Sequence, residues 1–456
     1  MLVDLAADHP AEQTVETWLR ADFALEDRRP DTTLRAALWA DHAARWAPGV
    51  PAEAELWLRP GPTGLQHRAG PWTIEAGHLV PRRGRLDLLP AADVLVGRDL
   101  RAGPATPLGR LRQPTLLVNV QRALGPARLA LHVQPVGAMD RPAFFGTDWA
   151  LLPPAVFADL QRSLPARATD PLVGPLLAEA GGALLAGLDA ANADSRAALE
   201  AALLAGGPDA ATGARAEAVA EAGLDGAGWD LRLRGGWVRA RRPALRIHPA
   251  LAPLATGAPL PSLADLPGLS AALDAPFTLV LPRSAVAAAD ASAALGPVGL
   301  RVEAAAWSAR ALQVQGFGVA LSPALDAALG LDWSPGPRLL LAAEARVEHL
   351  SSAPAGLLLV APTGAQAAAL ARVLLARERL RLTAAATVDL AFAEALLRPE
   401  VGFAASDHLD LALAALLLHA PAPPPRTLAE AAAYTGGPIG YAGASDALLA
   451  TLTWTP

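Results

Sequence analysis

The sequence predicts an α+β protein in which a helical region joins two β-rich modules. Three observations support this class. Apolar and polar residues alternate along many segments, an Ala- and Leu-rich stretch separates two groups of such segments, and the composition is strongly apolar. Hydrophobic residues make up 52% of the 456 residues and charged residues 18%, so the chain can bury a large core. This length allows two or three domains.

Residues 1–150 are expected to hold two helices and then the first β-rich module. Within residues 10–47 the apolar side chains recur about every 3.6 residues, which favours helices, and Asp31 is suited to cap the second. From Glu53 to Val136 the period becomes two. Such alternation, interrupted by Gly and Pro, predicts half-buried antiparallel strands, for example at Leu129, Leu131 and Val133.

Residues 151–226 are predicted to form the helical connecting region, because Ala- and Leu-rich runs there are separated by Gly-Gly pairs. The second β-rich module is placed at residues 227–420. It begins with alternation around Leu231 and Leu233, and later strands are predicted at Leu339–Val347 and Leu409–Leu418.

Several finer predictions concern the second half of the chain. The pattern favours a strand at Phe277–Leu281, a compact helix at Ser284–Leu295 and a long strand at Leu380–Phe392. A β-bulge is predicted near Gly316, where the apolar residues change parity. Residues 421–456 are read as a Pro-rich linker and flexible Gly-rich tail with one short helix at Leu428–Ala433.

Residue usage excludes several chemistries. The chain has no Cys and no Lys, which excludes disulfides, thiolate nucleophiles, Walker-type phosphate loops and Schiff-base catalysis. The nine His residues show no HxxxH or HExxH spacing, and no G-x-S-x-G motif occurs, so neither a metal site nor a hydrolase is predicted. The net charge of −6 argues against nucleic-acid binding. We therefore expect a protein that is not an enzyme and has no cofactor.

The N-terminus indicates a cytoplasmic protein. It lacks the basic residues and apolar core of a signal peptide, and no run reaches the roughly 18–20 apolar residues of a membrane-spanning helix.

One stretch resembles a known family. Residues 258–286 read APLPSLADLPGLSAALDAPFTLVLPRSAV, and they are followed by LRVEAAAWSARALQVQGFGVAL and PRLLLAAEARVEHL. This order is similar to the second half of a bacterial family of uncharacterised proteins related to tubular lipid-binding (TULIP, BPI/SMP-like) domains. The resemblance implies long, curved antiparallel sheets wrapped around helices as a super-roll, with an apolar groove for acyl chains. Family members carry an export signal or lipoprotein cysteine, which implies association with the envelope.

The function predicted from these features is non-enzymatic binding or transport of a lipid or other apolar ligand, with peripheral contact to a membrane. The alternative is a structural or assembly protein that has a dry core and binds other proteins. The oligomeric state is not predicted. Candidate groove residues, which could equally be ordinary sheet core, are Leu312, Val314, Phe317, Val319 and Leu321. Candidate headgroup ligands, which could equally lie on a solvated sheet face, are Arg232, Arg234, Arg239 and Arg241.

Overall fold

The computed structural model describes most of the chain, and nearly all of this part is β-strand. The described residues are 2–4, 15–46, 53–80, 84–100, 112–135, 140–142, 156, 159, 216–239, 241–249, 277–442 and 446–454.

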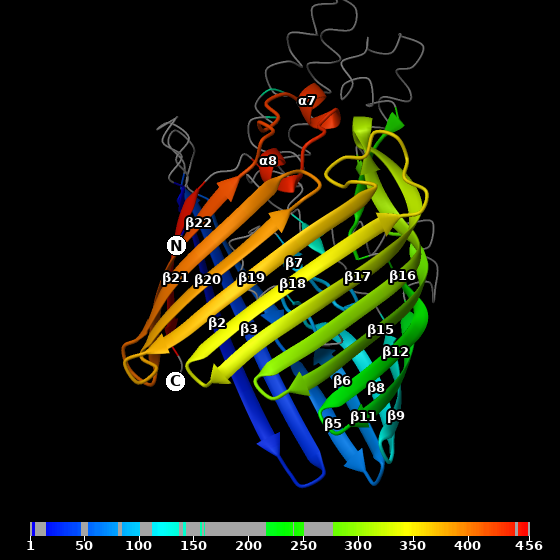
Figure 1. The fold of residues 1–456 in the computed structure, drawn as a ribbon, viewed down its shortest axis with the longest axis vertical. Helices are drawn as coiled ribbons and strands as arrows, with labels where there is room; N and C mark the ends of the chain where they lie inside the picture. Colours follow the sequence, from blue (N-terminus) through cyan, green and yellow to red (C-terminus); the bar gives the residue numbers. More distant parts are fainter. Residues whose placement is uncertain are drawn as a thin grey trace, which may run out of the picture.

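One antiparallel sheet of 19 strands forms the body of the molecule (Figure 1). Its strands are β1 (Leu2–Asp4), β2 (Val15–Arg28), β3 (Thr32–Trp46), β4 (Glu53–Pro60), β5 (Thr63–Ala69), β6 (Trp72–Leu79), β8 (Thr115–Leu124), β9 (Ala127–Gln134), β11 (Glu217–Gly226), β12 (Trp229–Arg239), β15 (Arg283–Leu295), β16 (Val298–Val314), β17 (Gly318–Gly336), β18 (Leu339–Leu350), β19 (Thr363–Leu375), β20 (Leu380–Asp389), β21 (Glu394–Ala404), β22 (Leu409–His419) and β23 (Ala447–Trp454).

This sheet closes on itself. Each strand pairs with the next one along the sheet, and β1 pairs with β2 on one edge and with β23 on the other. Because β4 and β5 pair with successive parts of β3, they occupy one place, and the 19 strands make a ring of 18 positions. The result is a closed antiparallel barrel with a short seam. At the seam β1 pairs with β2 at two positions and with β23 at three, and among the described residues β4 pairs only with β3.

The two ends of the barrel differ. At one end the strands are joined by short turns such as Gly70-Pro71, Gly125-Pro126 and Gly296-Pro297. These glycines have φ near +60°, the value of the first central position in a type II′ hairpin turn. At the other end the connections are longer, and they include α7 (Leu428–Ala432) and α8 (Pro438–Tyr441), which lie above β22 in Figure 1.

Several short elements complete the described part of the chain. The strands β7 (Asp99–Leu100) and β10 (Arg141–Pro142) form a small parallel pair, and β13 (Ala244–Ile247) and β14 (Phe277–Val280) form an antiparallel pair. A single 3₁₀ turn, η4 (Gln315–Phe317), joins β16 to β17. No helix within the described residues is long and apolar enough to cross a bilayer.

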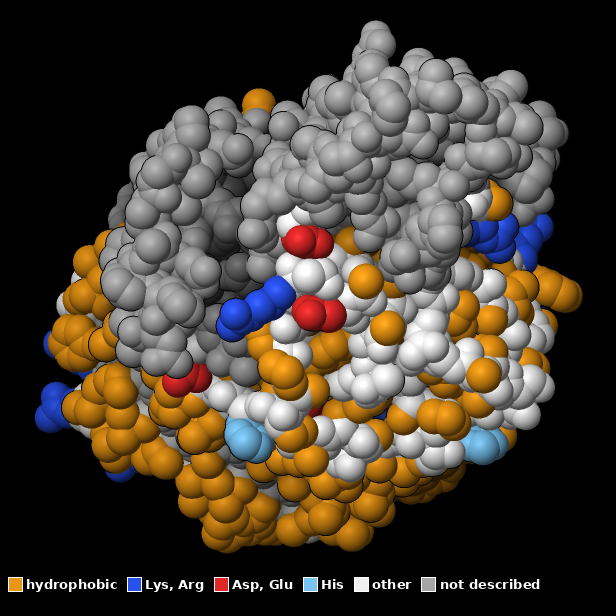
Figure 2. Space-filling view, turned by 90° about the horizontal axis from the view of Figure 1, so that it is seen from above, with side chains coloured by type: hydrophobic (Ala, Val, Ile, Leu, Met, Phe, Trp, Pro, Cys, Tyr) orange, Lys and Arg blue, Asp and Glu red, His pale blue; other side chains and the backbone are white. Residues whose placement is uncertain are grey.

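Side chains on the barrel wall are arranged with apolar groups outward and charged groups inward. On β17, Leu325 and Leu329 are 52% and 46% exposed, whereas Asp326 between them is 3% exposed. On β18, Val347 is exposed and its neighbour Arg346 is buried. Figure 2 shows hydrophobic side chains along much of the outer rim. The wall therefore has the reverse of the pattern of a water-soluble sheet.

The predicted α+β class and the TULIP resemblance are wrong. The two expected β-rich modules belong to one closed sheet, and no sheet wraps around helices in the described part of the chain. The helices expected within residues 10–47 are the strands β2 and β3, and the helix expected at Ser284–Leu295 is β15. Alanine, which is frequent in β3 and β15, favours helices when packing is not considered. Most of residues 151–226 lies outside the described residues, although β11 falls within that range.

The finer predictions have mixed outcomes. The long strand predicted at Leu380–Phe392 is β20, which ends at Asp389, and the short helix at Leu428–Ala433 is confirmed as α7. At Gly316 the structure has a turn between two strands, with φ of 70° at the glycine, so the change of parity marks a hairpin and not a bulge. The tail from residue 446 is the strand β23, which closes the barrel.

Candidate functional site

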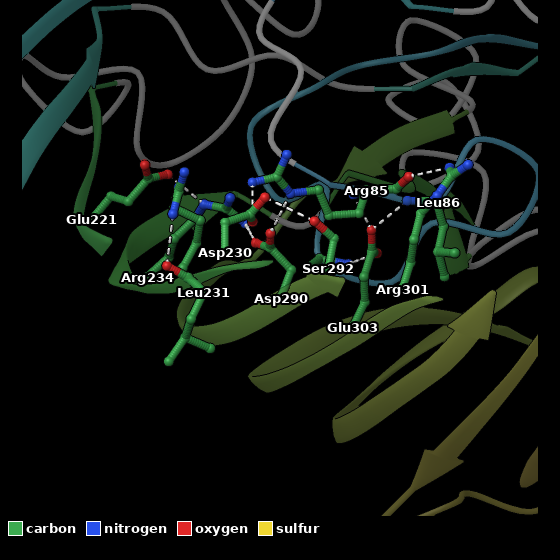
Figure 3. Close-up of polar contacts among 12 residues, drawn as sticks. Arg85, Leu86, Glu221, Asp230, Leu231, Arg234, Asp290, Ser292, Arg301 and Glu303 are labelled. Atoms are coloured by element: carbon green, nitrogen blue, oxygen red, sulfur yellow. Dashed lines mark hydrogen bonds and ion pairs between the residues drawn. The ribbon is translucent and has the colours of Figure 1, made fainter. Parts of the chain in front are cut away.

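One side of the barrel interior carries a continuous network of ion pairs (Figure 3). Arg234 on β12 lies 2.7 Å from Glu221 on β11 and 2.6 Å from Asp290 on β15. Arg85, from the segment between β6 and β8, also pairs with Asp290 and with Asp230. The strand register places Glu221 directly opposite Arg234, so the wall itself brings these charges together. Their partners compensate charges that would be costly to bury alone.

A second cluster lies on β16, β17 and β18. Arg310 pairs with both Asp326 and Glu348. Arg346 lies 2.8 Å from Asp326 and 3.3 Å from Glu348. Each of the two arginines thus binds both carboxylates. Because every member holds the others, this part of the wall presents a fixed set of charges to the interior.

A pocket of about 470 Å³ lies against this second cluster. Its walls come from the barrel strands, from the segments that fold inward before β8 and after β12, and from α8. The lining includes five arginines and five carboxylates, which are Arg98, Arg241, Arg242, Arg310, Arg346, Asp93, Asp140, Asp326, Glu348 and Asp389. These charged groups would be costly to bury without partners, so the pocket is not a purely apolar cavity.

Arg242 differs from Arg241, Arg310 and Arg346, which also line the pocket. Arg241 binds Glu217 at 2.6 Å, and Arg310 and Arg346 share the carboxylates named above. Arg242 is exposed to the pocket, and its charge acts on Glu348 without a hydrogen bond or short ion pair between them. Its guanidinium is therefore available to a solute.

The segment between β22 and β23 forms the upper wall of the pocket. The Glu394 carboxylate accepts hydrogen bonds from the N–H groups of Ile439 (3.0 Å) and Gly440 (2.8 Å) in α8. The rings of Tyr434 and Tyr441 meet edge to face with centroids 5.0 Å apart. Burial, together with the nearby Glu394 charge, raises the pKa of Tyr434 to about 12, so this phenol stays neutral at physiological pH. The Gly-rich segment read as a flexible tail is thus docked on the barrel.

The five predicted groove residues do not form one surface. Leu312 and Phe317 are buried near the end of the barrel that has longer connections, whereas Leu321 is exposed on the outer wall. Val314 and Val319 are half-buried and stand next to the η4 turn. The predicted function of lipid binding in an apolar groove is wrong, since these five described residues lie on different surfaces. Whether any of the five contacts another ligand stays a prediction.

Three of the four predicted headgroup arginines are buried in the barrel interior. Arg232 pairs with Asp225, Arg234 with Glu221 and Asp290, and Arg241 with Glu217. Arg239 is half-buried at the end of β12. Binding of an anionic group by these arginines stays a prediction, and among them Arg241 lines the pocket. Arg242 belongs to the same basic stretch of the sequence, but the acidic partners could not be found from the sequence, because several come from strands distant in the chain.

Among the residues that the structure describes, no group of three or more His, Asp or Glu side chains is placed to hold a metal ion.

No protein-family model matches the chain, and no curated protein matches its sequence. Solved structures that resemble it include OccAB4 of Acinetobacter baumannii, with a TM-score of 0.48 and 6% identity over 100% of this chain and 95% of that one. OccK7 (OpdD) of Pseudomonas aeruginosa has a TM-score of 0.45 and 8% identity over 98% and 94% of the two chains. OpdK of Pseudomonas aeruginosa with vanillate has a TM-score of 0.41 and 8% identity over 97% and 93%.

None of these three structures reaches a TM-score of 0.5 or 25% identity, so they say nothing of what this chain does. Evidence for the barrel architecture comes from the strand pairing described above, and evidence for function lies in the chain's own side chains.

Proposed function

We propose that this protein is a membrane-spanning β-barrel that lets small hydrophilic solutes pass through its interior. The observation that carries the proposal is the reversed burial of the wall, in which leucines such as Leu325 and Leu329 point outward while Asp326 and Arg346 point inward. A bilayer solvates such a surface, whereas water would not. The polar interior would then be the route for solutes.

The dimensions of the wall support this. On β17 the outward side chains run from Leu321 to Trp333, and twelve residue steps of about 3.3 Å at a tilt of about 40° span roughly 30 Å. This matches an apolar band of about 25 Å with its flanking interface.

Exposed aromatic residues near the short turns give a second, independent support. Trp72, Trp229, Trp333 and Phe403 are all exposed, and each lies within a few residues of one of these turns. Aromatic rings gather at the boundary between lipid tails and water in membrane barrels. This belt of aromatic residues supports a location in the envelope, whereas the sequence alone indicated the cytoplasm. It also supports a protein that spans the membrane, whereas the sequence suggested only peripheral contact.

The test is reconstitution of the purified protein into planar bilayers. We expect stepwise conductance increases as single barrels insert, and we expect the protein to be found with the membrane fraction of the cells that express it. A protein that stays monomeric and folded in buffer without detergent would contradict the proposal, as would barrels that insert and carry no current.

Charge selectivity should depend on Arg242. In water a unit charge acts on an ion about 5 Å away with about 0.8 kcal/mol, or roughly fourfold in local concentration. Arg242→Gln should therefore lower the ratio of anion to cation permeability by about that factor, measured from the reversal potential across a salt gradient at low ionic strength. Arg29→Gln, in an exposed short turn, is the matched control. Equal reversal potentials for the two variants would show that solutes do not pass Arg242.

A further inference from the structure

We propose that Glu303 and Glu344 are positioning residues that set the width of the passage by holding the segment Arg85–Ala92 as a fixed constriction. The effect on permeation rests on the proposed channel function. The anchoring itself does not, because it depends only on contacts within the barrel.

The two carboxylates bind every backbone N–H of this segment. Glu303 on β16 accepts hydrogen bonds from Arg85, Leu86 (2.7 Å), Ala91 (2.7 Å) and Ala92 (2.8 Å). Glu344 on β18 accepts them from Asp87 (3.1 Å), Leu88 (2.9 Å) and Leu89 (2.6 Å). The remaining residue is Pro90, which has no N–H.

The two carboxylates supply the hydrogen-bond acceptors that a helix or a sheet would otherwise provide for this segment. The segment contains no strand or helix, so its buried N–H groups would otherwise lack partners. Hydrogen bonds to a carboxylate are about twice as strong as those between neutral groups. Seven of them on two buried side chains therefore fix both the position and the path of the segment.

The wall between the two carboxylates is shaped to receive the segment. On β17, Ala328 lies opposite Glu303 and Gly330 lies opposite Glu344. Leu86 packs in a cluster with Ala91 and Ala328. A Cβ added at Gly330 would collide with the Leu86 side chain. Small residues thus form a recess for the segment, with a carboxylate on each side of it.

The held segment continues directly into the pocket wall. Pro90 and Ala91 line the pocket, and so do Asp93, Val96 and Arg98 immediately after them. Arg241, another lining residue, donates a hydrogen bond of 2.8 Å to the carbonyl oxygen of Val94. Movement of the segment away from the wall would therefore change the size and the charge of the pocket at once.

The test uses Glu303→Gln, Glu344→Gln and the double variant. Glutamine has nearly the same shape as glutamate, but an NH₂ group replaces one of the two acceptor oxygens. Backbone N–H groups of the segment that were bound to that oxygen lose their acceptor and face another donor. Glu400→Gln is the matched control, because Glu400 is also an inward wall carboxylate but binds Arg381 and Arg398 instead of the segment.

Two readouts separate the anchoring from the channel. The chain has no cysteine, so Ala92→Cys gives a single reporter whose reaction with a water-soluble thiol reagent measures release of the segment. We expect the labelling rate to rise about tenfold or more in the Glu303→Gln background and to stay unchanged with Glu400→Gln. Conductance should rise in the same variants. If the double variant does not fold, Glu344→Gln alone, which affects three of the seven bonds, gives the comparison.

Equal labelling in all backgrounds would overturn the anchoring. If labelling rises as expected but even the parent protein conducts no ions, the channel function fails and the anchoring stands.

Discussion

Replacing Leu329 with arginine should destabilise the folded protein in a bilayer by about 2–4 kcal/mol, the cost of placing such a charge near the middle of the lipid-facing wall. Leu329 is 46% exposed and lies four residues from Trp333, which we place at the interface. The loss should appear as a lower midpoint of urea unfolding in liposomes, followed by the fluorescence of the 11 tryptophans.

A matched control is available on the same strand and the same face. Leu321 is also exposed and lies at the far end of the outward row, where an arginine reaches the headgroups and should cost about 0–1 kcal/mol. If the wall faced water, both substitutions would stay within about 0.5 kcal/mol of the parent. A pair of variants that are equally stable would therefore disprove the membrane-spanning barrel, whatever the conductance experiments show.

The strands themselves were largely predictable, but the side of the sheet that faces the core was not. Alternation predicted β9, β18 and β22 in about the right places. On β12 the same alternation suggested leucines inside and arginines outside, whereas Leu233 is 52% exposed and Arg232 is 3% exposed. A period of two says that one face is apolar but not what lies next to that face. A bilayer outside and a protein core inside give the same pattern.

Helices were predicted where the alternation was weak or was read with the wrong period. On β15 the outward positions are mostly alanine and the inward ones include Val286, Ala288 and Asp290, so the two faces differ little in hydropathy. On β2 the exposed Phe23 and Leu25 keep the parity of Val15, but Trp18 lies on the other parity and helped to suggest a helical period. Pairing with neighbouring strands makes these segments β-strands, although their local sequence favours a helix.

The candidate site was less predictable than the strands, because its partners are far apart in the sequence. The segment that holds Leu86 contacts Glu303 and Glu344 more than 200 residues later. Neither carboxylate belongs to a recognisable sequence motif. Only closure of the barrel brings an inward loop and an inward carboxylate together. An unexplained charge on the supposed apolar side of a strand is the signal that could have pointed to them.

Replacing Arg234 with methionine should destabilise the barrel by up to about 3–5 kcal/mol, because two buried carboxylates lose the partner that they share. The loss is limited by Arg85, which still pairs with Asp290, and by Arg128, which lies 3.5 Å from Glu221. Glu221 and Asp290 both lie within 2.7 Å of the guanidinium, and neither side chain is more than 2% exposed. Unfolding in urea again gives the measurement. Arg398→Met is the control, because Arg398 pairs with Glu400 at 3.3 Å where both side chains are more accessible, and it should cost about 0–1 kcal/mol.

The cause of that loss can be isolated by removing the charges left behind. In the triple variant with Arg234→Met, Glu221→Gln and Asp290→Asn, no uncompensated carboxylate remains at these positions, so much of the stability should return. Recovery would assign the effect to electrostatics and not to lost packing of the long arginine side chain. If the triple variant is no more stable than Arg234→Met alone, Arg234 stabilises the wall by the packing of its side chain and not by its charge. The inward charges would then contribute little to stability, and their role would lie in the interaction with solutes.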